Sequence, residues 1–140
     1  MKTCLIVEDS SLIREIALRI LTDLKIEAKE AESAALALEQ CRASKPDAVL
    51  LDWDLPSFGA LDFLRGISEL PLEERPTIIL CATENDPQQF TLAKAAGAAH
   101  YVLKPFDRET LSAKFSEIGL IDAGALPEPR PVQSARIDRQ

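Results

Sequence analysis

Two kinds of hydrophobic pattern alternate along the first 120 residues of the chain. Short apolar runs predict five strands, at Thr3–Val7, Glu27–Ala31, Ala48–Leu51, Thr77–Ala82 and Ala99–Leu103, of which the second is the weakest. After each run, apolar side chains recur at the three- and four-residue spacing of a helix. Strands that are apolar on both faces are typical of parallel sheets covered by helices on each side. The pattern therefore predicts an α/β fold, a five-stranded parallel sheet with helices on both faces.

The expected helices have recognisable amino ends. Ser33 and Asp107 precede helical patterns as N-cap residues, and Asp86 does so with Pro87 at the first helical position and Gln89 placed for a capping box. For the first helix, which carries apolar residues from Leu12 to Leu24, either Asp9 or Ser10 fits as the cap.

Composition narrows the class of protein. The 140 residues suit one domain, and the formal net charge of −7 argues against binding DNA or RNA through the overall field. No apolar run approaches the roughly 20 residues of a membrane span, and none at the start resembles a signal peptide. The three cysteines have no metal-site or disulfide spacing, which predicts buried thiols in a reducing cytoplasm.

The chain changes character near Leu126. Residues 1–126 are expected to form the domain, whereas residues 127–140 begin with three prolines among five residues and hold few large apolar groups. This tail is predicted to be disordered. An alternative is that its arginines, Arg130, Arg136 and Arg139, contact an anionic ligand such as a dinucleotide, because arginine pairs bidentately with phosphate.

Charged residues follow three of the predicted strands. Glu8 and Asp9 come after the first, Asp52 after the third and Lys104 after the last. The carboxyl ends of parallel strands meet at one sheet edge, so these side chains are expected to converge there. Grouped carboxylates repel one another unless a cation neutralises them, and hard oxygen ligands suit Mg²⁺. With a lysine as partner for a phosphate, the set predicts phosphoryl transfer with Asp52 as a carboxylate nucleophile.

Any one of these residues alone is more often structural, since acids after strands commonly cap helices. It is the conjunction of an acidic pair, a single acid and Lys-Pro, each ending a separate strand, that favours a functional site.

With these residues the sequence resembles the receiver domains of two-component signalling. The resemblance is to single-domain, CheY-like response regulators, which have a flavodoxin-like (βα)5 fold. The resemblance covers residues 2 to about 120. It implies that Glu8 and Asp9 bind Mg²⁺, with Asp9 the more direct ligand and the backbone carbonyl of Asp54 a further one. It also implies that Asp52 accepts a phosphoryl group from a histidine kinase or histidine phosphotransferase, and that Lys104 contacts that group.

The same resemblance assigns further roles. Tyr101 lies where receivers place an aromatic switch residue, and Asp54 and Glu84 occupy positions that tune hydrolysis of the acyl phosphate. The Lys104–Pro105 bond is cis in the family. Receivers commonly meet their downstream protein targets through the face made of the fourth helix, fifth strand and fifth helix. Since no output domain follows in the sequence, a stand-alone cytoplasmic regulator that is not an enzyme is expected.

Two positions depart from the family pattern. Where receivers carry Asp-Gly after the acceptor loop, this chain has Gly59-Ala60, so the loop is expected to bend differently or to place Gly59 at positive φ. The fourth strand of receivers ends in Thr or Ser. Counted back from Lys104 without gaps, the matching residue here is Ala82, and a shift of one residue would make it Cys81 or Thr83. Without that hydroxyl, the coupling of phosphorylation to Tyr101 is expected to be weakened or rerouted.

Two other classes of function stay open on the sequence alone. A pseudo-receiver, an interaction adaptor that switches without phosphate, is favoured by Ala82 and opposed by the intact acid set. A phosphatase of the haloacid-dehalogenase type shares Asp52-x-Asp54 after an apolar strand, but its motifs come in the reverse order. A dinucleotide-binding fold is excluded because no glycine-rich turn follows the first strand.

Overall fold

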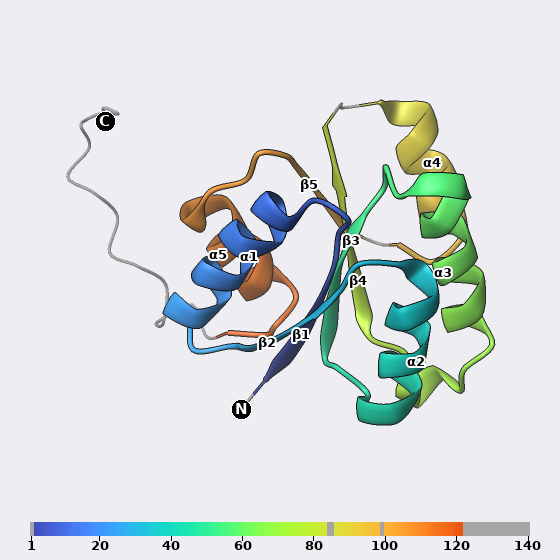
Figure 1. The fold of residues 1–140 in the computed structure, drawn as a ribbon, viewed down its shortest axis with the longest axis horizontal. Helices are drawn as coiled ribbons and strands as arrows, with labels where there is room; N and C mark the ends of the chain where they lie inside the picture. The colour runs from blue at the N-terminus through green and yellow to red at the C-terminus, as the bar shows by residue number, and fades with distance from the viewer. Residues whose placement is uncertain (1, 84–85, 99, 122–140) are drawn as a thin grey trace.

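The computed structural model describes residues 2–83, 86–98 and 100–121, and shows a single parallel sheet (Figure 1). Its strands are β1 (Thr3–Val7), β2 (Glu27–Ala31), β3 (Ala48–Asp52), β4 (Thr77–Ala82) and β5 (His100–Leu103). They lie in the order β2-β1-β3-β4-β5, and every neighbouring pair is parallel. The predicted fold class is therefore confirmed.

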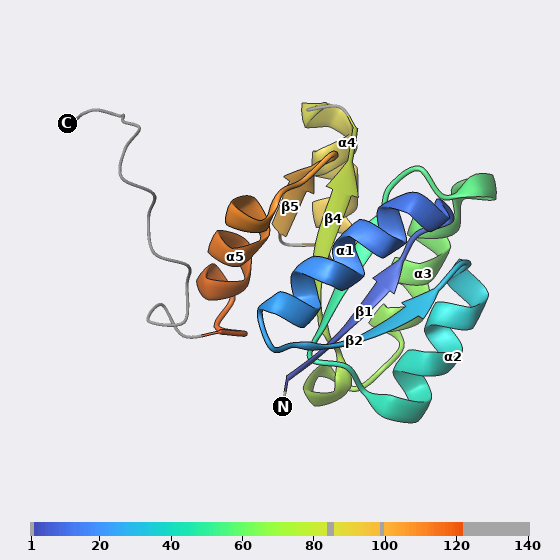
Figure 2. The ribbon, with the colours of Figure 1, turned by 60° about the vertical axis from the view of Figure 1, so that its left-hand side comes forward.

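Helices cover both faces of the sheet. They are α1 (Ser11–Asp23), α2 (Ala34–Ser44), α3 (Gly59–Ser68), α4 (Pro87–Ala95) and α5 (Arg108–Glu117), with short 3₁₀ turns η1 (Pro56–Phe58) and η2 (Leu72–Glu74). Helices α1 and α5 pack on one face, and α2, α3 and α4 on the other (Figures 1 and 2). Strand residues alternate between the two resulting cores, because successive side chains of a strand point to opposite faces. Ile6 faces the first and Leu5 the second.

The helix starts follow the predicted caps. The side chains of Ser10, Ser33, Asp86 and Asp107 each accept a hydrogen bond from a backbone N–H in the first turn of a helix. At α1 the N-cap is Ser10 and not Asp9, so the Asp9 carboxylate does not cap the helix.

The strand order creates a switch point between β1 and β3. From β1 the chain crosses to β2 on one side, and β3 then lies on the other side of β1, with Val7 paired to Leu51 at their carboxyl ends. Crevices at such points are where open α/β sheets bind ligands. The topology of the chain therefore places Glu8, Asp9 and Asp52 together at the edge of the sheet where β1 and β3 end.

Of the two alternatives expected for the loop after β3, the structure contradicts the one that places Gly59 at positive φ. Gly59 has φ −56° and begins α3 in ordinary helical geometry, so neither it nor Ala60 is the strained residue. Ser57 takes the left-handed conformation instead, with φ 58° and ψ 38°. Gly59 instead allows close packing, because a Cβ there would lie 3.2 Å from the Cβ of Leu55, tighter than ordinary contact.

Other sequence-based assignments lie outside the described residues. They include Glu84, Ala99, which is the first residue of the predicted last strand, and the predicted tail at 127–140. Among the helices that the structure describes, none combines the length and the apolar character needed to cross a membrane.

The three cysteines are free and buried, as predicted. Burial raises the pKa of Cys4 to about 12 and that of Cys41 to about 11, and it raises the pKa of Cys81 as well. The thiolate is the species that reacts with alkylating agents. The raised pKa values leave little thiolate at any of these cysteines near neutral pH.

We therefore expect the native protein to resist iodoacetamide at about pH 8, and all three thiols to react once guanidinium unfolds the chain. Mass spectrometry of intact protein over time measures this difference. A cysteine that reacts as fast in the native as in the unfolded protein would contradict the buried placement of that thiol.

Candidate metal centre at the carboxyl edge of the sheet

Three carboxylates meet where β1 and β3 end. Glu8, Asp9 and Asp52 each offer an oxygen atom, and these atoms lie within 4.8 Å of one another. Glu8 and Asp52 are buried, whereas Asp9 is exposed. The cluster therefore has a closed inner side and an open side from which an ion or a phosphate can approach.

Lys104 reaches this cluster from the end of β5. Its Nζ lies 2.8 Å from Asp52 Oδ1 and 3.0 Å from Glu8 Oε1, and its side chain is only 8% exposed. Because β4 lies between β3 and β5, the lysine must extend across the end of β4, where its backbone N–H donates to the carbonyl oxygen of Ala82 at 2.7 Å. The following Lys104–Pro105 bond is cis.

The local electrostatics follow from burial. Burial raises the pKa of Glu8, and the hydrogen bonds from the Ser10 backbone N–H and the Lys104 ammonium oppose this effect without cancelling it. For Lys104, burial alone would lower the pKa, but the hydrogen bonds to Asp52 and Glu8 outweigh it and the pKa is raised. The ammonium is thus held in its charged form between two acids, as a built-in counter-ion.

Backbone groups orient two of the carboxylates. The N–H of Asp54 donates to Asp52 Oδ1 at 3.0 Å, and the N–H of Ser10 donates to Glu8 Oε2 at 3.0 Å. These bonds fix one oxygen of each side chain, so their remaining lone pairs point in defined directions.

Arg14, which the sequence analysis did not single out, supports the same edge. Its Nη1 donates to the carbonyl oxygen of Glu8 at 2.7 Å, and its Nε lies 3.3 Å from Glu30 Oε1. The sequence feature that could have indicated this role is the position of Arg14 one turn into a helix that begins directly after the acidic pair. That signal is weak, because many arginines at such positions point into solvent.

The remaining predicted residues surround the cluster without joining it. The Asp54 side chain is exposed, and its Oδ2 accepts a long hydrogen bond of 3.5 Å from Thr83 Oγ1. Ala82 is buried at the end of β4, and as an alanine it supplies no hydroxyl there. The neighbouring Thr83 is exposed. Half-buried Tyr101 packs on Phe90 of α4, with ring centroids 4.5 Å apart.

The donor set suits a hard divalent cation. Carboxylate oxygens are the ligands that Mg²⁺ takes from proteins, usually one or two of them, with waters and a substrate phosphate completing the shell. Two buried acids facing one another at this distance would repel without a cation, and Lys104 neutralises only part of their charge. Glu8, Asp9 and Asp52 therefore fit Mg²⁺, which would supply positive charge beside a transferring phosphoryl group.

Comparison with known proteins identifies related chains. The family model described as "Response regulator receiver domain" matches residues 4–116. The chain is 33% identical over 116 residues to the chemotaxis protein CheY-3 of Vibrio cholerae serotype O1, covering 81% of this chain and 88% of that protein. It is 26% identical over 114 residues to the phosphate regulon transcriptional regulatory protein PhoB of Escherichia coli, covering 81% of this chain and 50% of PhoB.

A solved structure agrees with these matches. The chemotaxis response regulator CheY4 of Vibrio cholerae superposes with a TM-score of 0.78 at 26% identity, covering 84% of this chain and 98% of that one.

Proposed function

Since the chain belongs to the response regulator receiver domain family, we propose that it accepts a phosphoryl group on Asp52, with Mg²⁺ bound, from a histidine kinase or histidine phosphotransferase. The phosphorylated domain then passes the signal on through protein contacts. One observation carries this proposal: Glu8, Asp9 and Asp52 gather within 4.8 Å, and Lys104 bridges two of them.

The geometry suggests which oxygen of Asp52 reacts. Among the described residues, both hydrogen bonds to this carboxylate go to Oδ1, from Lys104 and from the backbone of Asp54. Oδ2 then keeps its lone pairs for attack on phosphorus. The new O–P bond forms as the P–N bond of the phosphohistidine breaks, and the leaving imidazole retains the electron pair and takes up a proton from solvent.

Lys104 changes partners in this scheme. It neutralises Asp52 before transfer, and afterwards its ammonium pairs with an oxygen of the phosphoryl group as a point charge. Mg²⁺, when bound, neutralises charge on the phosphoryl oxygens. Glu8, Asp9 and Asp52 would supply the ligands on the protein side, together with the backbone carbonyl of Asp54.

For the output we propose the face of α4, β5 and α5. Tyr101 on β5 packs against Phe90 on α4, so a movement of this ring would change the α4 surface. On this view the domain acts as a signalling module and not as an enzyme that turns over substrate, with Asp54 and Glu84 tuning the lifetime of the acyl phosphate.

A direct experiment tests the acceptor. Incubation of the chain with acetyl phosphate and Mg²⁺, followed by reduction of the acyl phosphate with borohydride and peptide mass spectrometry, should map one modified residue, Asp52. A chelator such as EDTA should abolish the modification. Modification elsewhere, or sustained hydrolysis of a generic phosphomonoester, would contradict the proposal, and the latter would favour the phosphatase alternative.

Ala82 supports a second candidate, an adaptor that switches by another route. A buried methyl group stands where a hydroxyl would otherwise draw the β4–α4 loop toward the phosphoryl group. We therefore expect the phosphate mimic beryllofluoride to displace Tyr101 less in the wild type than in Ala82→Thr. NMR shifts of the Tyr101 ring measure the displacement, with Ala82→Gly as the variant that adds no hydroxyl. Equal, full displacement of Tyr101 in wild type and Ala82→Thr would refute this expectation.

A further inference from the structure

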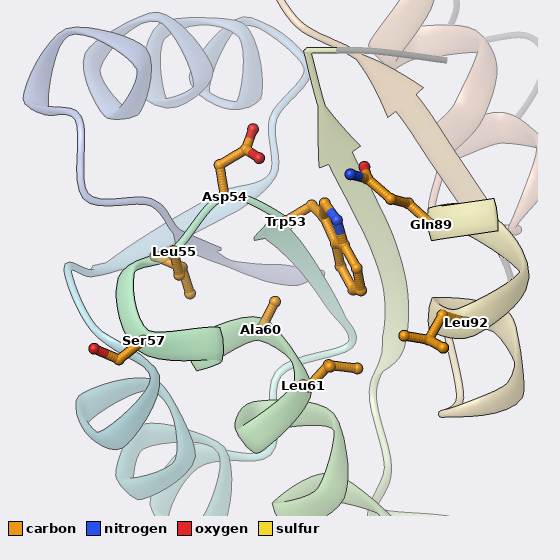
Figure 3. A pocket seen from close by; sticks show the side chains of 8 residues that line it. All are labelled: Trp53, Asp54, Leu55, Ser57, Ala60, Leu61, Gln89 and Leu92. Atoms are coloured by element: carbon orange, nitrogen blue, oxygen red, sulfur yellow. The ribbon is translucent and has the colours of Figure 1, made fainter. Parts of the chain in front are cut away.

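A cavity of about 470 Å³ lies beside the metal centre, between the loop after β3, helix α3 and helix α4 (Figure 3). Its walls are mainly apolar: the indole of Trp53 on one side, Ala60 and Leu61 of α3 below it, and Leu92 of α4 opposite. This volume and this apolar lining are typical of cavities that hold a ligand. The phosphoryl-transfer chemistry proposed above uses none of these side chains.

Leu92 makes the cavity part of a longer surface. Its side chain is 54% exposed, although leucine is usually buried. A second hollow of about 390 Å³ shares Leu92 and is lined only by uncharged residues of α4, including Pro87, Thr91 and Ala95. Two neighbouring apolar hollows separated by one side chain suit a peptide that offers two apolar side chains better than a single small ring.

Charge indicates what else the occupant carries. Asp54 is the only charged side chain among the described residues that line either hollow, and it stands exposed at the rim of the first. The described contact of its carboxylate is the 3.5 Å bond from Thr83, which leaves most of its hydrogen-bonding capacity unused. The whole chain carries a net charge of −7, which attracts basic partners at long range.

We propose that this α3–α4 cavity, defined by Trp53, Leu61, Leu92 and Asp54, docks a partner protein through a short basic and apolar segment. An aromatic or large aliphatic side chain enters beside Trp53, a second apolar side chain covers the α4 hollow, and a neighbouring arginine pairs with Asp54. The site shares α4 with the α4–β5–α5 face but uses Trp53 and α3 in place of β5 and α5. It holds whether or not Asp52 accepts a phosphoryl group.

The test uses the capped peptide Ac-Arg-Phe-Ser-Leu-NH₂ as the probe, with NMR of the isotope-labelled full chain as the readout. We expect saturable shifts of the Trp53 indole and of the Leu61 and Leu92 methyl groups. The charge-reversed probe Ac-Glu-Phe-Ser-Leu-NH₂ should bind about tenfold more weakly, since it places a like charge against Asp54. Asp54→Asn should remove most of that difference between the two peptides.

Two leucine variants test whether the basic probe binds at the α3–α4 cavity. Leu92→Ser should weaken the basic probe about tenfold, whereas Leu72→Ser, at a leucine that is 76% exposed in η2, should leave its affinity unchanged. The absence of shifts at Trp53, Leu61 and Leu92 up to about 10 mM of the basic probe would overturn the proposal. It would also be overturned if these resonances moved with protein concentration alone, because a second copy of the chain would then be the occupant.

Discussion

Asp52→Asn is expected to lose phosphorylation by acetyl phosphate completely. The asparagine amide keeps the shape of the side chain and can still accept the bond from the Asp54 N–H, so the loop after β3 should hold its path. It has no carboxylate oxygen to attack phosphorus, and it removes one of the three acids that gather within 4.8 Å. We therefore also expect Mg²⁺ affinity to fall about tenfold, or ~1.4 kcal/mol. Mass spectrometry reports the first effect, and the fluorescence of Trp53, the single tryptophan, reports the second.

The matched control for this variant is Asp54→Asn. It makes the same chemical change two residues away, on a side chain that is exposed and lies outside the carboxylate cluster. Asp54→Asn should still take one phosphoryl group on Asp52, with Mg²⁺ affinity weakened by the loss of nearby negative charge. If Asp52→Asn were labelled at Asp9 or Asp54, or if Asp54→Asn lost its label, the assignment of the acceptor would be wrong.

The parts of this molecule that follow from short-range pattern and topology could be predicted from the sequence. The strands at Thr3–Val7 and Thr77–Ala82 match their apolar runs residue for residue, because a buried parallel strand must be apolar on both faces. The meeting of Glu8 and Asp52 then needs only the rule that parallel strands bring their carboxyl ends to one edge.

The features that the sequence pattern did not predict depend on distances between elements. The alternative in which Gly59 takes positive φ is wrong, because Ser57 takes that conformation and Gly59 packs close to Leu55. Arg14 could not be assigned to the Glu8 carbonyl without knowing how α1 leans over the end of β1. The cavity beside Trp53 exists only because α3 and α4 leave space between them. Each of these results is decided by tertiary packing, which local pattern does not encode.

The second large effect is expected from Lys104→Met, in metal-free buffer. Methionine replaces the long stem of the lysine but removes the ammonium that lies 2.8 Å from Asp52 and 3.0 Å from Glu8. Two buried carboxylates are then left facing each other without a counter-ion. Breaking a buried pair in this way typically costs about 3–5 kcal/mol, and we expect the free energy of unfolding, measured by urea titration, to fall by about 3 kcal/mol.

Mg²⁺ should reverse most of that loss, because it neutralises the same two acids. A ligand that binds only the folded state stabilises it by about 2.7 kcal/mol at a concentration of 100 times its Kd, so the variant should regain stability at saturating Mg²⁺ and lose it again with EDTA. Lys29→Met is the matched control, since its ion pair with Glu27 is 3.8 Å long and half-exposed and should contribute less than about 1 kcal/mol with or without metal. Equal stability of Lys104→Met and wild type without metal would mean that Lys104 does not serve as the counter-ion of Glu8 and Asp52. A loss of stability that Mg²⁺ does not restore would mean that these acids are not its ligands.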